Sequence, residues 1–472
     1  MTGDKYQYLL VLYEALLTMR LGSGVVGVEF EIPDAGNVDD LVIIGPGGPV
    51  EYHQVKFVLE PTGDPLTAAW FTEKKSEKAT SPLQKFHASL IKLGRPCMWL
   101  QTNRDADPED PILGRRNGRN LNLGERLRAA NARLVREAIE VWCEHLELPR
   151  DELLDFLDHL HVQTGEPAYE RLVVACGDRM RGEGLRGEPE MVKAALAMVE
   201  DLVIDNKQRV DREELNRIIE KLGLRADDAR ATLLVQQVVE DPWPDAATAA
   251  VDWTRCFEDD APEARRRLRA DLDWNEHLLP PLREAADAIR GSGHARVLIT
   301  GSPRLSGWFA AGFTLRQVTG LEVTARSGPT SWSSHETQTA MPVERMEPAQ
   351  LGNGEEIAIA ISVPRLIGDA VRQYLEPSSG AIAELVELRA EGAPDNVLIQ
   401  DAEQARGLMT AFFLEIEKVA AGRPIHLFFA APGPLLGLLG HRWNRMPPLQ
   451  LYEDTGGGGA DGYRPTFAFD KT

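Results

Sequence analysis

Short apolar runs alternate with stretches of helical periodicity between residues 295 and 444, and this alternation restricts the folds open to the second half of the chain. Strands are predicted at 295–301, 321–327, 356–363, 396–401 and 424–432. Helices are predicted at 308–318, 366–376, 402–421 and 435–444. Strands that are apolar throughout and separated by helices are buried on both faces, as in parallel sheets. The sequence therefore predicts an α/β domain with a mainly parallel sheet.

Three loops follow predicted strands, and ligands of open α/β sheets bind beyond the carboxyl ends of the strands. The loops lie at 301–307, 362–369 and 431–440; all are rich in Gly and Pro, and the first two contain Arg. None has the spacing of a dinucleotide fingerprint or of a Walker A loop. Such strand-to-helix turns suit an anionic ligand held by a helix N-terminus and a guanidinium, although arginines after strands are also common on surfaces.

Residues 38–57 contain an acidic pair and a Gln-x-Lys motif, on two predicted strands joined by a Gly-Pro turn. Residues two apart in a strand share a face, so Gln54 and Lys56 point the same way. The turn brings Asp39 or Asp40 alongside, and only one of these two neighbours can face the pair. A carboxylate and an amide oxygen are suitable ligands for Mg²⁺, and a nearby ammonium stabilises developing negative charge. The motif therefore favours metal-dependent phosphodiester hydrolysis, the chemistry of nucleases.

The segments around this motif predict further elements of the same domain. A helix is predicted from residue 6 to about residue 20, because apolar side chains recur there at helical spacing. A second helix is predicted at 81–94 and a buried strand at 96–105. Glu14 lies at the edge of the apolar stripe of the first helix, either on a solvated face or near the acidic pair.

Charge is unevenly distributed along the chain. The formal net charge is −21, yet residues 1–130 carry 15 Lys+Arg and 17 Asp+Glu, so most of the negative charge lies further on. Lys74, Lys75 and Lys78 fall in one short loop, which suits a phosphate backbone as well as a solvated surface. The net charge therefore does not exclude nucleic acid as a partner of the N-terminal part.

Two domains are predicted from the 472 residues, at 1–235 and 236–472. The pattern from about 121 to 235 is helical and is interpreted as an extension of the first domain. Residues 236–250 are rich in Pro, Ala and Asp, as a linker or domain start would be.

The start of the chain lacks a signal peptide, and no run of eighteen apolar residues predicts a membrane span, so a cytoplasmic protein is expected. The four cysteines are scattered without paired spacing, which argues against zinc and against a disulfide framework.

The order of helix, strand, Asp-bearing strand, Gln-x-Lys strand and helix resembles the PD-(D/E)XK, restriction-endonuclease-like fold, in the variant with Gln in place of Glu. The resemblance implies that Asp40, with Asp39 as the alternate, and Gln54 bind Mg²⁺. It implies that Lys56 orients or activates the attacking water, and it makes Glu14 a candidate metal ligand.

The C-terminal half resembles the SAVED family through 251–260, 273–282, the block 296–315, the isolated Trp332 and 426–469. Domains of this family look like two fused CARF-like, Rossmann-type halves that sense cyclic oligonucleotides in bacterial CBASS immunity. The candidate ligand contacts that follow are Arg304 and Arg365 for phosphates, Trp332 for stacking on a base, and Pro432 and His441 in the second half.

Together the two resemblances imply a CBASS endonuclease effector. A cyclic di- or trinucleotide would bind the SAVED domain and drive homo-oligomerisation, and the nuclease heads would then cut double-stranded DNA. Two alternatives stay open, namely a catalytically inactive sensor and a nuclease that acts on RNA or single-stranded DNA.

Overall fold

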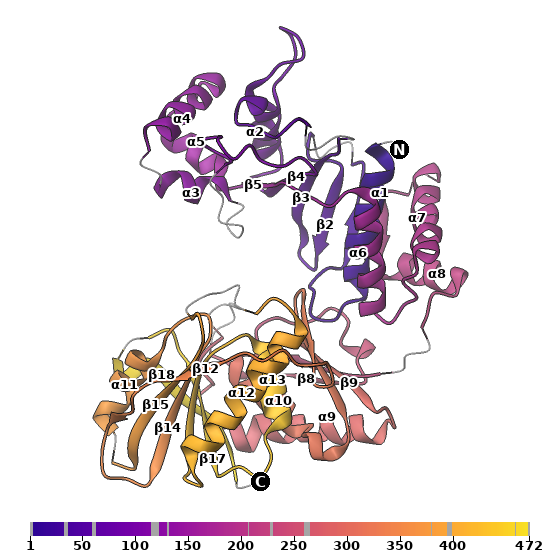
Figure 1. The fold of residues 1–472 in the computed structure, drawn as a ribbon. Helices are drawn as coiled ribbons and strands as arrows, with labels where there is room; N and C mark the ends of the chain where they lie inside the picture. The colour runs from indigo at the N-terminus through magenta and orange to yellow at the C-terminus, as the bar shows by residue number, and fades with distance from the viewer. Residues whose placement is uncertain are drawn as a thin grey trace. The chain divides into compact units, whose positions relative to one another are not determined.

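The computed structural model describes residues 3–32, 36–58, 63–114, 122–129, 132–205, 207–226, 230–258, 265–378, 380–393, 399–457 and 459–470. The chain forms two compact units (Figure 1). The first unit comprises Met1–Arg20 and Val25–Asp228, and the second comprises Leu21–Gly24 and Ala229–Thr472. No helix in the described ranges combines the length and the apolar character needed to cross a membrane.

The first unit is built on one mixed sheet with the strand order β5-β4-β3-β2-β1-β6. Its strands are β1 (Gly27–Glu29), β2 (Leu41–Gly45), β3 (Gly48–Lys56), β4 (Cys97–Thr102), β5 (Leu160–Gln163) and β6 (Arg209–Asp211). Strand β2 pairs antiparallel with β1 and β3, whereas β3, β4 and β5 run parallel. The Gln-x-Lys motif thus lies on β3, at the junction of the antiparallel and parallel parts.

Helices cover both faces of this sheet. They are α1 (Gly3–Ala15), α2 (Pro82–Lys92), α3 (Leu123–Ala129), α4 (Arg133–Leu146), α5 (Arg150–Leu157), α6 (Tyr169–Gly182), α7 (Pro189–Ile204) and α8 (Arg212–Leu222). One core joins α1, α6, α7 and α8 to Val28, Ile43 and Val55, and a second joins α2, α4 and α5 to Leu100 and Val162. Because Gln54 is in register with Leu100 while Val55 faces the α1 side, the Gln-x-Lys face is the α2 side of the sheet.

The predicted elements around the motif are largely confirmed. The first helix runs as α1 and continues in a 3₁₀ turn to Met19, and α2 and β4 fall within their predicted ranges. Helix α2 begins with a capping box. The hydroxyl of Ser81 accepts a hydrogen bond from the backbone nitrogen of Gln84, and the side-chain oxygen of Gln84 accepts one from the backbone nitrogen of Ser81. The interval from 121 to 235 is not wholly helical, because β5 and β6 complete the two edges of the sheet.

The second unit contains two separate sheets, both mainly parallel. The first has the order β11-β10-β9-β7-β8 and the second the order β12-β15-β14-β16-β17-β18, with β13 also on β15. The first sheet consists of β7 (Ala231–Gln236), β8 (Ala249–Asp252), β9 (Arg296–Gly301), β10 (Glu322–Ser327) and β11 (Thr330–Ser333). The second consists of β12 (Val343–Arg345), β13 (Ala349–Gln350), β14 (Glu356–Ser362), β15 (Ile382–Ala390), β16 (Ile425–Ala430), β17 (Leu449–Asp454) and β18 (Tyr463–Phe469).

The helices of the second unit are α9 (Leu279–Gly291), α10 (Leu305–Thr314), α11 (Gly368–Leu375), α12 (Ala402–Ala420) and α13 (Gly433–Arg442). The prediction of an α/β domain with mainly parallel strands is therefore confirmed. The second unit begins at Ala229, earlier than the predicted boundary after residue 235. That boundary would divide β7, which pairs with β8 and β9 of this unit.

One predicted strand, 396–401, is not confirmed. Residues 394–398 lie outside the described residues, and 399–401 lead into α12, where Asp401 caps the helix by accepting from the backbone of Gln404. Strand β14 instead pairs in parallel with β15 on one side and β16 on the other, and β15 was not predicted.

The glycines of the predicted loop 431–440 allow two helices to pack closely. Most of this stretch is helix α13, which lies against α10 (Figure 1). A Cβ atom built on Gly312 of α10 would overlap the carbonyl oxygen of Gly437, and one on Gly440 would overlap the carbonyl oxygen of Phe309. Backbone contact between the two helices thus explains the glycines at 312 and 440.

Candidate functional site

Asp40, Gln54 and Lys56 come together at one end of the sheet of the first unit. The Asp40 carboxylate accepts a hydrogen bond from the backbone nitrogen of Val55 at 2.7 Å and another from the side-chain amide of Gln54. Both aspartates precede β2, which begins at Leu41, rather than lying on the strand as predicted. Of the two, Asp40 is the one that contacts the Gln-x-Lys strand.

The environment of Asp40 disfavours its charged form in the absence of a cation. Burial raises the pKa of the carboxyl, and the neighbouring charge of Asp39 adds to this. The charge of Lys56 and the hydrogen bonds from Val55 and Gln54 act in the opposite direction but do not cancel the effect of burial. A buried carboxyl with a raised pKa gains from any cation that replaces its missing hydration.

Glu14 does not join this cluster. It lies on α1, which packs on the face of the sheet opposite to Gln54 and Lys56, and its carboxylate pairs with Arg179 of α6 at 3.1 Å. The same guanidinium stacks on Tyr13, 3.3 Å from the ring centre. The geometry therefore gives Glu14 a structural role between α1 and α6.

Gln54 and Lys56 line a cavity of about 660 Å³ on the α2 side of the sheet. Apolar side chains form part of its wall, including Trp70, Leu100 and Phe86. Basic side chains also line it, and these are Lys56, Lys74, Lys75, Lys78, Lys85 and Arg104. The cavity thus joins the candidate catalytic residues to the lysine-rich loop noted in the sequence.

The residues at this site provide a small oxygen donor set for Mg²⁺. Asp40 supplies a carboxylate. The amide nitrogen of Gln54 donates to this carboxylate, so a half-turn rotation of the amide group would be needed to turn its oxygen toward the same point. Mg²⁺ commonly keeps several waters and binds through one or two carboxylates together with substrate phosphates, a pattern that one carboxylate and one amide oxygen fit. Within the described ranges, no group of three or more His, Cys, Asp and Glu side chains is arranged to hold a metal.

In the second unit, the predicted turn after β9 is closed by an internal carboxylate. Glu453 of β17 accepts hydrogen bonds from the backbone nitrogen and hydroxyl of Ser306, at 2.9 and 2.7 Å, in the first turn of α10. Arg304, directly before this helix, is half-buried and donates from Nε to the carbonyl oxygen of Arg265 at 3.0 Å. An anionic ligand would therefore meet an occupied helix N-terminus at this turn.

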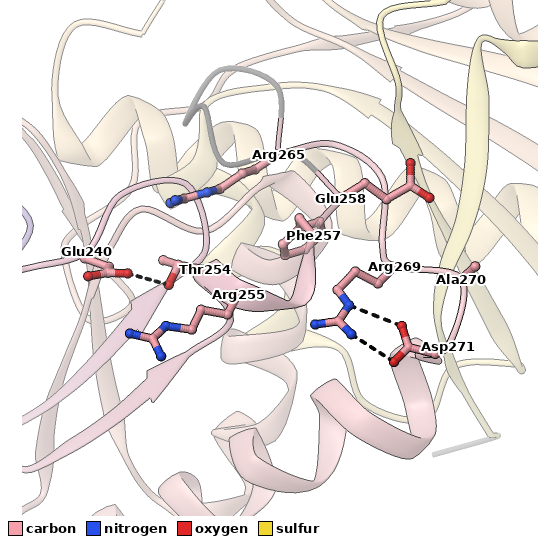
Figure 2. Close-up of a pocket in the computed structure, with 9 residues that line it drawn as sticks. All are labelled: Glu240, Thr254, Arg255, Phe257, Glu258, Arg265, Arg269, Ala270 and Asp271. Atoms are coloured by element: carbon pink, nitrogen blue, oxygen red, sulfur yellow. Dashed lines mark hydrogen bonds and ion pairs between the residues drawn. The ribbon is translucent and has the colours of Figure 1, made fainter.

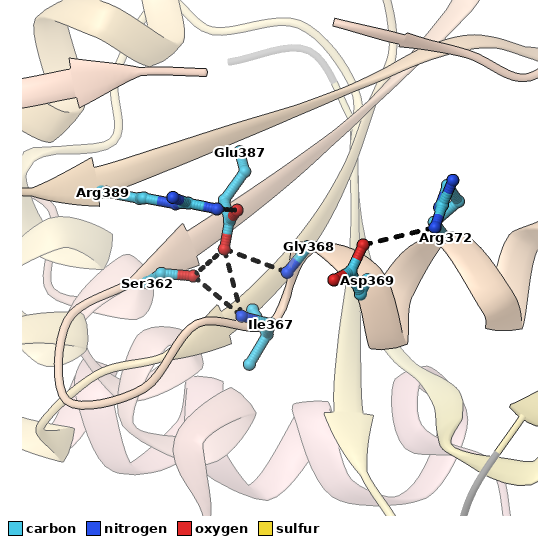
Figure 3. Close-up of polar contacts among 7 residues, drawn as sticks. All are labelled: Ser362, Ile367, Gly368, Asp369, Arg372, Glu387 and Arg389. Atoms are coloured by element: carbon cyan, nitrogen blue, oxygen red, sulfur yellow. Dashed lines mark hydrogen bonds and ion pairs between the residues drawn. The ribbon is translucent and has the colours of Figure 1, made fainter. Parts of the chain in front are cut away.

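The turn after β14 has the same arrangement (Figure 3). Glu387 accepts from the Ser362 hydroxyl at 2.6 Å and from the backbone nitrogens of Ile367 and Gly368 at 3.1 and 3.0 Å. Arg389 donates to the other oxygen of the same carboxylate. Arg365 of this loop is exposed and pairs with Asp454.

The other three residues predicted to contact a ligand are buried or half-buried against the rest of the second unit. Trp332 is only 6% exposed because β11 folds back antiparallel on β10, which turns its ring into the core rather than toward a base. His441 is 2% exposed and donates from Nδ1 to the carbonyl oxygen of Leu315. Pro432 is half-buried and lies directly before α13, at its N-cap position. The structure thus buries both Trp332 and His441, and the stacking role of the first and the pocket role of the second stay predictions.

A second cavity, of about 680 Å³, lies beyond the carboxyl ends of β7 and β8 (Figure 2). It is lined by Glu240, Thr254, Arg255, Phe257, Glu258, Arg265, Arg269, Ala270 and Asp271. Arg269 pairs with Asp271, and Glu240 accepts from Thr254, whereas no contact drawn in Figure 2 reaches Arg255. This is the position at which open parallel sheets bind ligands.

The sequence reading missed the residues of this second cavity. Its signal was the arginine-rich run at 265–269, together with Arg255 directly after a short strand. Arg304, which was predicted, contacts the wall of this cavity through Arg265. Predicting a parallel strand at 249–252 would have placed Arg255 and the run 265–269 near the carboxyl ends of the strands, beside Arg304.

Residues 281–469 match the model of the family described as "SMODS-associated and fused to various effectors sensor domain", or SAVED. The match lies entirely within the second unit and spans most of its two parallel sheets. The predicted resemblance to the SAVED family is confirmed for residues 281–469.

Solved structures resemble the whole chain at low identity. A structure of the Acinetobacter baumannii Cap4 SAVED/CARF-domain containing receptor with the cyclic trinucleotide 2'3'3'-cAAA is 17% identical, with a TM-score of 0.42, over 100% of this chain and 99% of that one. The receptor with 3'3'3'-cAAA is 16% identical, with a TM-score of 0.41, over 99% of each chain. The Moraxella osloensis Cap4 receptor is 16% identical, with a TM-score of 0.39, over 99% of each chain. No curated protein sequence matches the chain.

Proposed function

We propose that this chain is a cyclic-oligonucleotide-activated, Mg²⁺-dependent DNA endonuclease of CBASS antiviral defence. The first unit would cut double-stranded DNA, and the second would bind the cyclic nucleotide. The observation that carries the nuclease assignment is the convergence of Asp40, Gln54 and Lys56, because the last two line a basic cavity and Asp40 contacts Gln54.

The order of elements in the first unit supports this assignment. Helix α1 is followed by β1, β2, β3, α2 and β4, which agrees with the order expected for a restriction-endonuclease-like fold. In the proposed reaction Asp40 and Gln54 would hold Mg²⁺, and the ion would stabilise negative charge at the phosphate. Lys56 lies on the same face as Gln54 and orients the attacking water.

The SAVED match supports a sensor role for the second unit. The cavity beyond β7 and β8 provides a place for a phosphate-bearing ligand, since Arg255, Arg265 and Arg269 line it. The ligand must bind the assembled, active form more tightly than the inactive one, because equal affinity for both would shift no equilibrium.

The proposal is tested by plasmid cleavage with the purified protein and Mg²⁺, with and without a panel of cyclic di- and trinucleotides. Cutting that requires one of these nucleotides supports both halves of the proposal. Nucleotide binding without any cutting of DNA would contradict the nuclease assignment and favour an inactive sensor. Cutting of RNA alone would contradict the substrate assignment.

A further inference from the structure

Four lysines form one side of the cavity that contains the Gln-x-Lys motif. Lys74, Lys75 and Lys78 lie in the loop that precedes α2, and Lys85 lies on α2 itself. We name these four residues the lysine rim. All four are exposed, and none has an ion-pair partner among the residues that the structure describes. Their charges therefore face solvent and the cavity rather than a neighbouring carboxylate.

The cavity lining is strongly unbalanced in charge. Among the described residues that line it, Glu73 is acidic and six are basic. Arg104 is one of the six, but it forms an ion pair with Asp64 at 2.8 Å and lies over the ring of Trp70. These contacts give it a structural role. The lysine rim and Lys56 thus supply the positive charge that a ligand would meet. A cavity lined by one sign of charge concentrates partners of the opposite sign.

The rim is fixed at both ends by packed elements. Before the loop, Phe71 lies in a 3₁₀ turn and is fully buried, and after it Ser81 starts α2 with a capping box. Thr80 and Pro82 also line the cavity, so the positive end of α2 is turned toward it. The loop that carries the rim thus begins and ends at packed residues.

We propose that the lysine rim binds the sugar-phosphate backbone of duplex DNA and positions a phosphodiester over Asp40, Gln54 and Lys56. This inference rests on the proposed function, and it names the residues that hold the substrate. Lysines bind phosphates as point charges and do not read base edges in a fixed geometry, so the rim gives affinity without sequence preference. Backbone contacts of this kind fix the register of the substrate and make binding depend steeply on salt.

The test is DNA binding by the full-length protein in EDTA, which keeps cleavage out of the measurement. Fluorescence anisotropy of a labelled duplex is followed from about 50 to 200 mM salt, a range over which such contacts lose much of their affinity. The variant Lys74→Ala/Lys75→Ala/Lys78→Ala is expected to bind more weakly. Its plot of log affinity against log salt should be less steep by about 0.9 for each lysine removed.

The matched control is Lys193→Ala/Lys207→Ala/Lys221→Ala, which removes the same charge from exposed positions of the first unit outside the cavity. This control should keep the slope of the wild type, and the triple Lys→Arg variant of the loop should keep both affinity and slope. Equal losses in the two alanine triples would overturn the proposal, as would tighter binding of an RNA of the same length. If DNA binding depends on the lysine rim but no cleavage occurs in Mg²⁺, the result would support DNA binding by the rim and contradict only the proposed cleavage reaction.

Discussion

Glu453 and Ser306 join the two sheets of the second unit through a pair of hydrogen bonds at the N-terminus of α10. The acceptor comes from β17 in one sheet, and the donors lie in the first turn of α10, the helix that follows β9 of the other sheet. An internal carboxylate thus occupies the place where an anionic ligand was predicted. Any ligand of this turn has to compete with Glu453 or leave it in place.

The buried position of Glu453 predicts a pH dependence of stability. Burial raises the pKa of this carboxyl, and the bonds from Ser306 and the charge of Arg304 only partly oppose it. A carboxyl with a raised folded-state pKa weakens the fold as pH rises through that value, because the unfolded chain ionises more readily. Glu453→Gln keeps an acceptor and removes the titration. On acidification from neutral pH toward about 4.3, the unfolded value, the wild type should gain melting temperature relative to this variant. Parallel melting curves at all pH values would contradict the assignment.

Glu387 predicts the opposite sign. Burial acts to raise the pKa of its carboxyl, but the bonds from Ser362, Arg389 and two backbone nitrogens outweigh it, so the pKa is lowered. Its contribution to stability is present above about 4.3 and is lost as pH falls through the lower folded-state pKa. Glu387→Gln should therefore be less stable than the wild type at neutral pH, by about 1–3 kcal/mol. The difference should shrink in acid, and urea unfolding at several pH values measures it. A constant difference would show that the carboxylate charge is not involved.

The close contact of α10 and α13 predicts a strong effect of a small substitution. Gly312→Ala places a methyl group on the carbonyl oxygen of Gly437, and such overpacking costs about 1–3 kcal/mol. The control is Gly291→Ala at the end of α9, where a Cβ would meet no atom within 4 Å. The control should melt at or slightly above the wild-type temperature, and Gly312→Ala several degrees below it. Similar melting temperatures for both variants would mean that the helices separate at little cost.

The sequence allowed those parts of the structure to be predicted that depend on neighbours along the chain. Strand alternation and a short turn bring Asp40, Gln54 and Lys56 together within seventeen residues, so local rules were sufficient. The loops of the second unit were harder, because their partners come from distant strands. Nothing near residue 306 indicates that Glu453 will cap α10.

The burial of Trp332 likewise depends on contacts with distant segments that the local sequence does not reveal. The residue follows a strand and was assigned to a ligand, but its side chain depends on β11 pairing back onto β10 and on the core beneath. The arginines around the second cavity were missed for a related reason, since β8 has only four residues and gives a weak strand signal.

Lys56→Ala is expected to abolish DNA cleavage while leaving cyclic-nucleotide binding unchanged. Lys56 favours the charged form of Asp40, so its loss should raise the pKa of that carboxyl further and weaken metal binding near neutral pH. Cleavage assays and nucleotide calorimetry on the same preparation measure the two effects. The control Lys193→Ala removes an equal charge outside the cavity and should cut like the wild type. Wild-type cleavage by Lys56→Ala would contradict its place at the site.

Gln54→Glu should strengthen the metal site by adding a second carboxylate. In the present structure the Gln54 amide donates to Asp40, and a glutamate at this position would repel it instead. Without metal, two adjacent carboxylates raise each other's pKa, whereas Mg²⁺ relieves the repulsion by binding both. The variant should therefore reach half-maximal cleavage at a lower Mg²⁺ concentration than the wild type, and the Mg²⁺ requirement should fall further as pH rises. A Mg²⁺ titration of plasmid cleavage at two pH values measures this, with Gln7→Glu as a control, because Gln7 donates to the backbone oxygen of Asp40 and not to its carboxylate. An unchanged Mg²⁺ requirement in Gln54→Glu would place the metal away from residue 54.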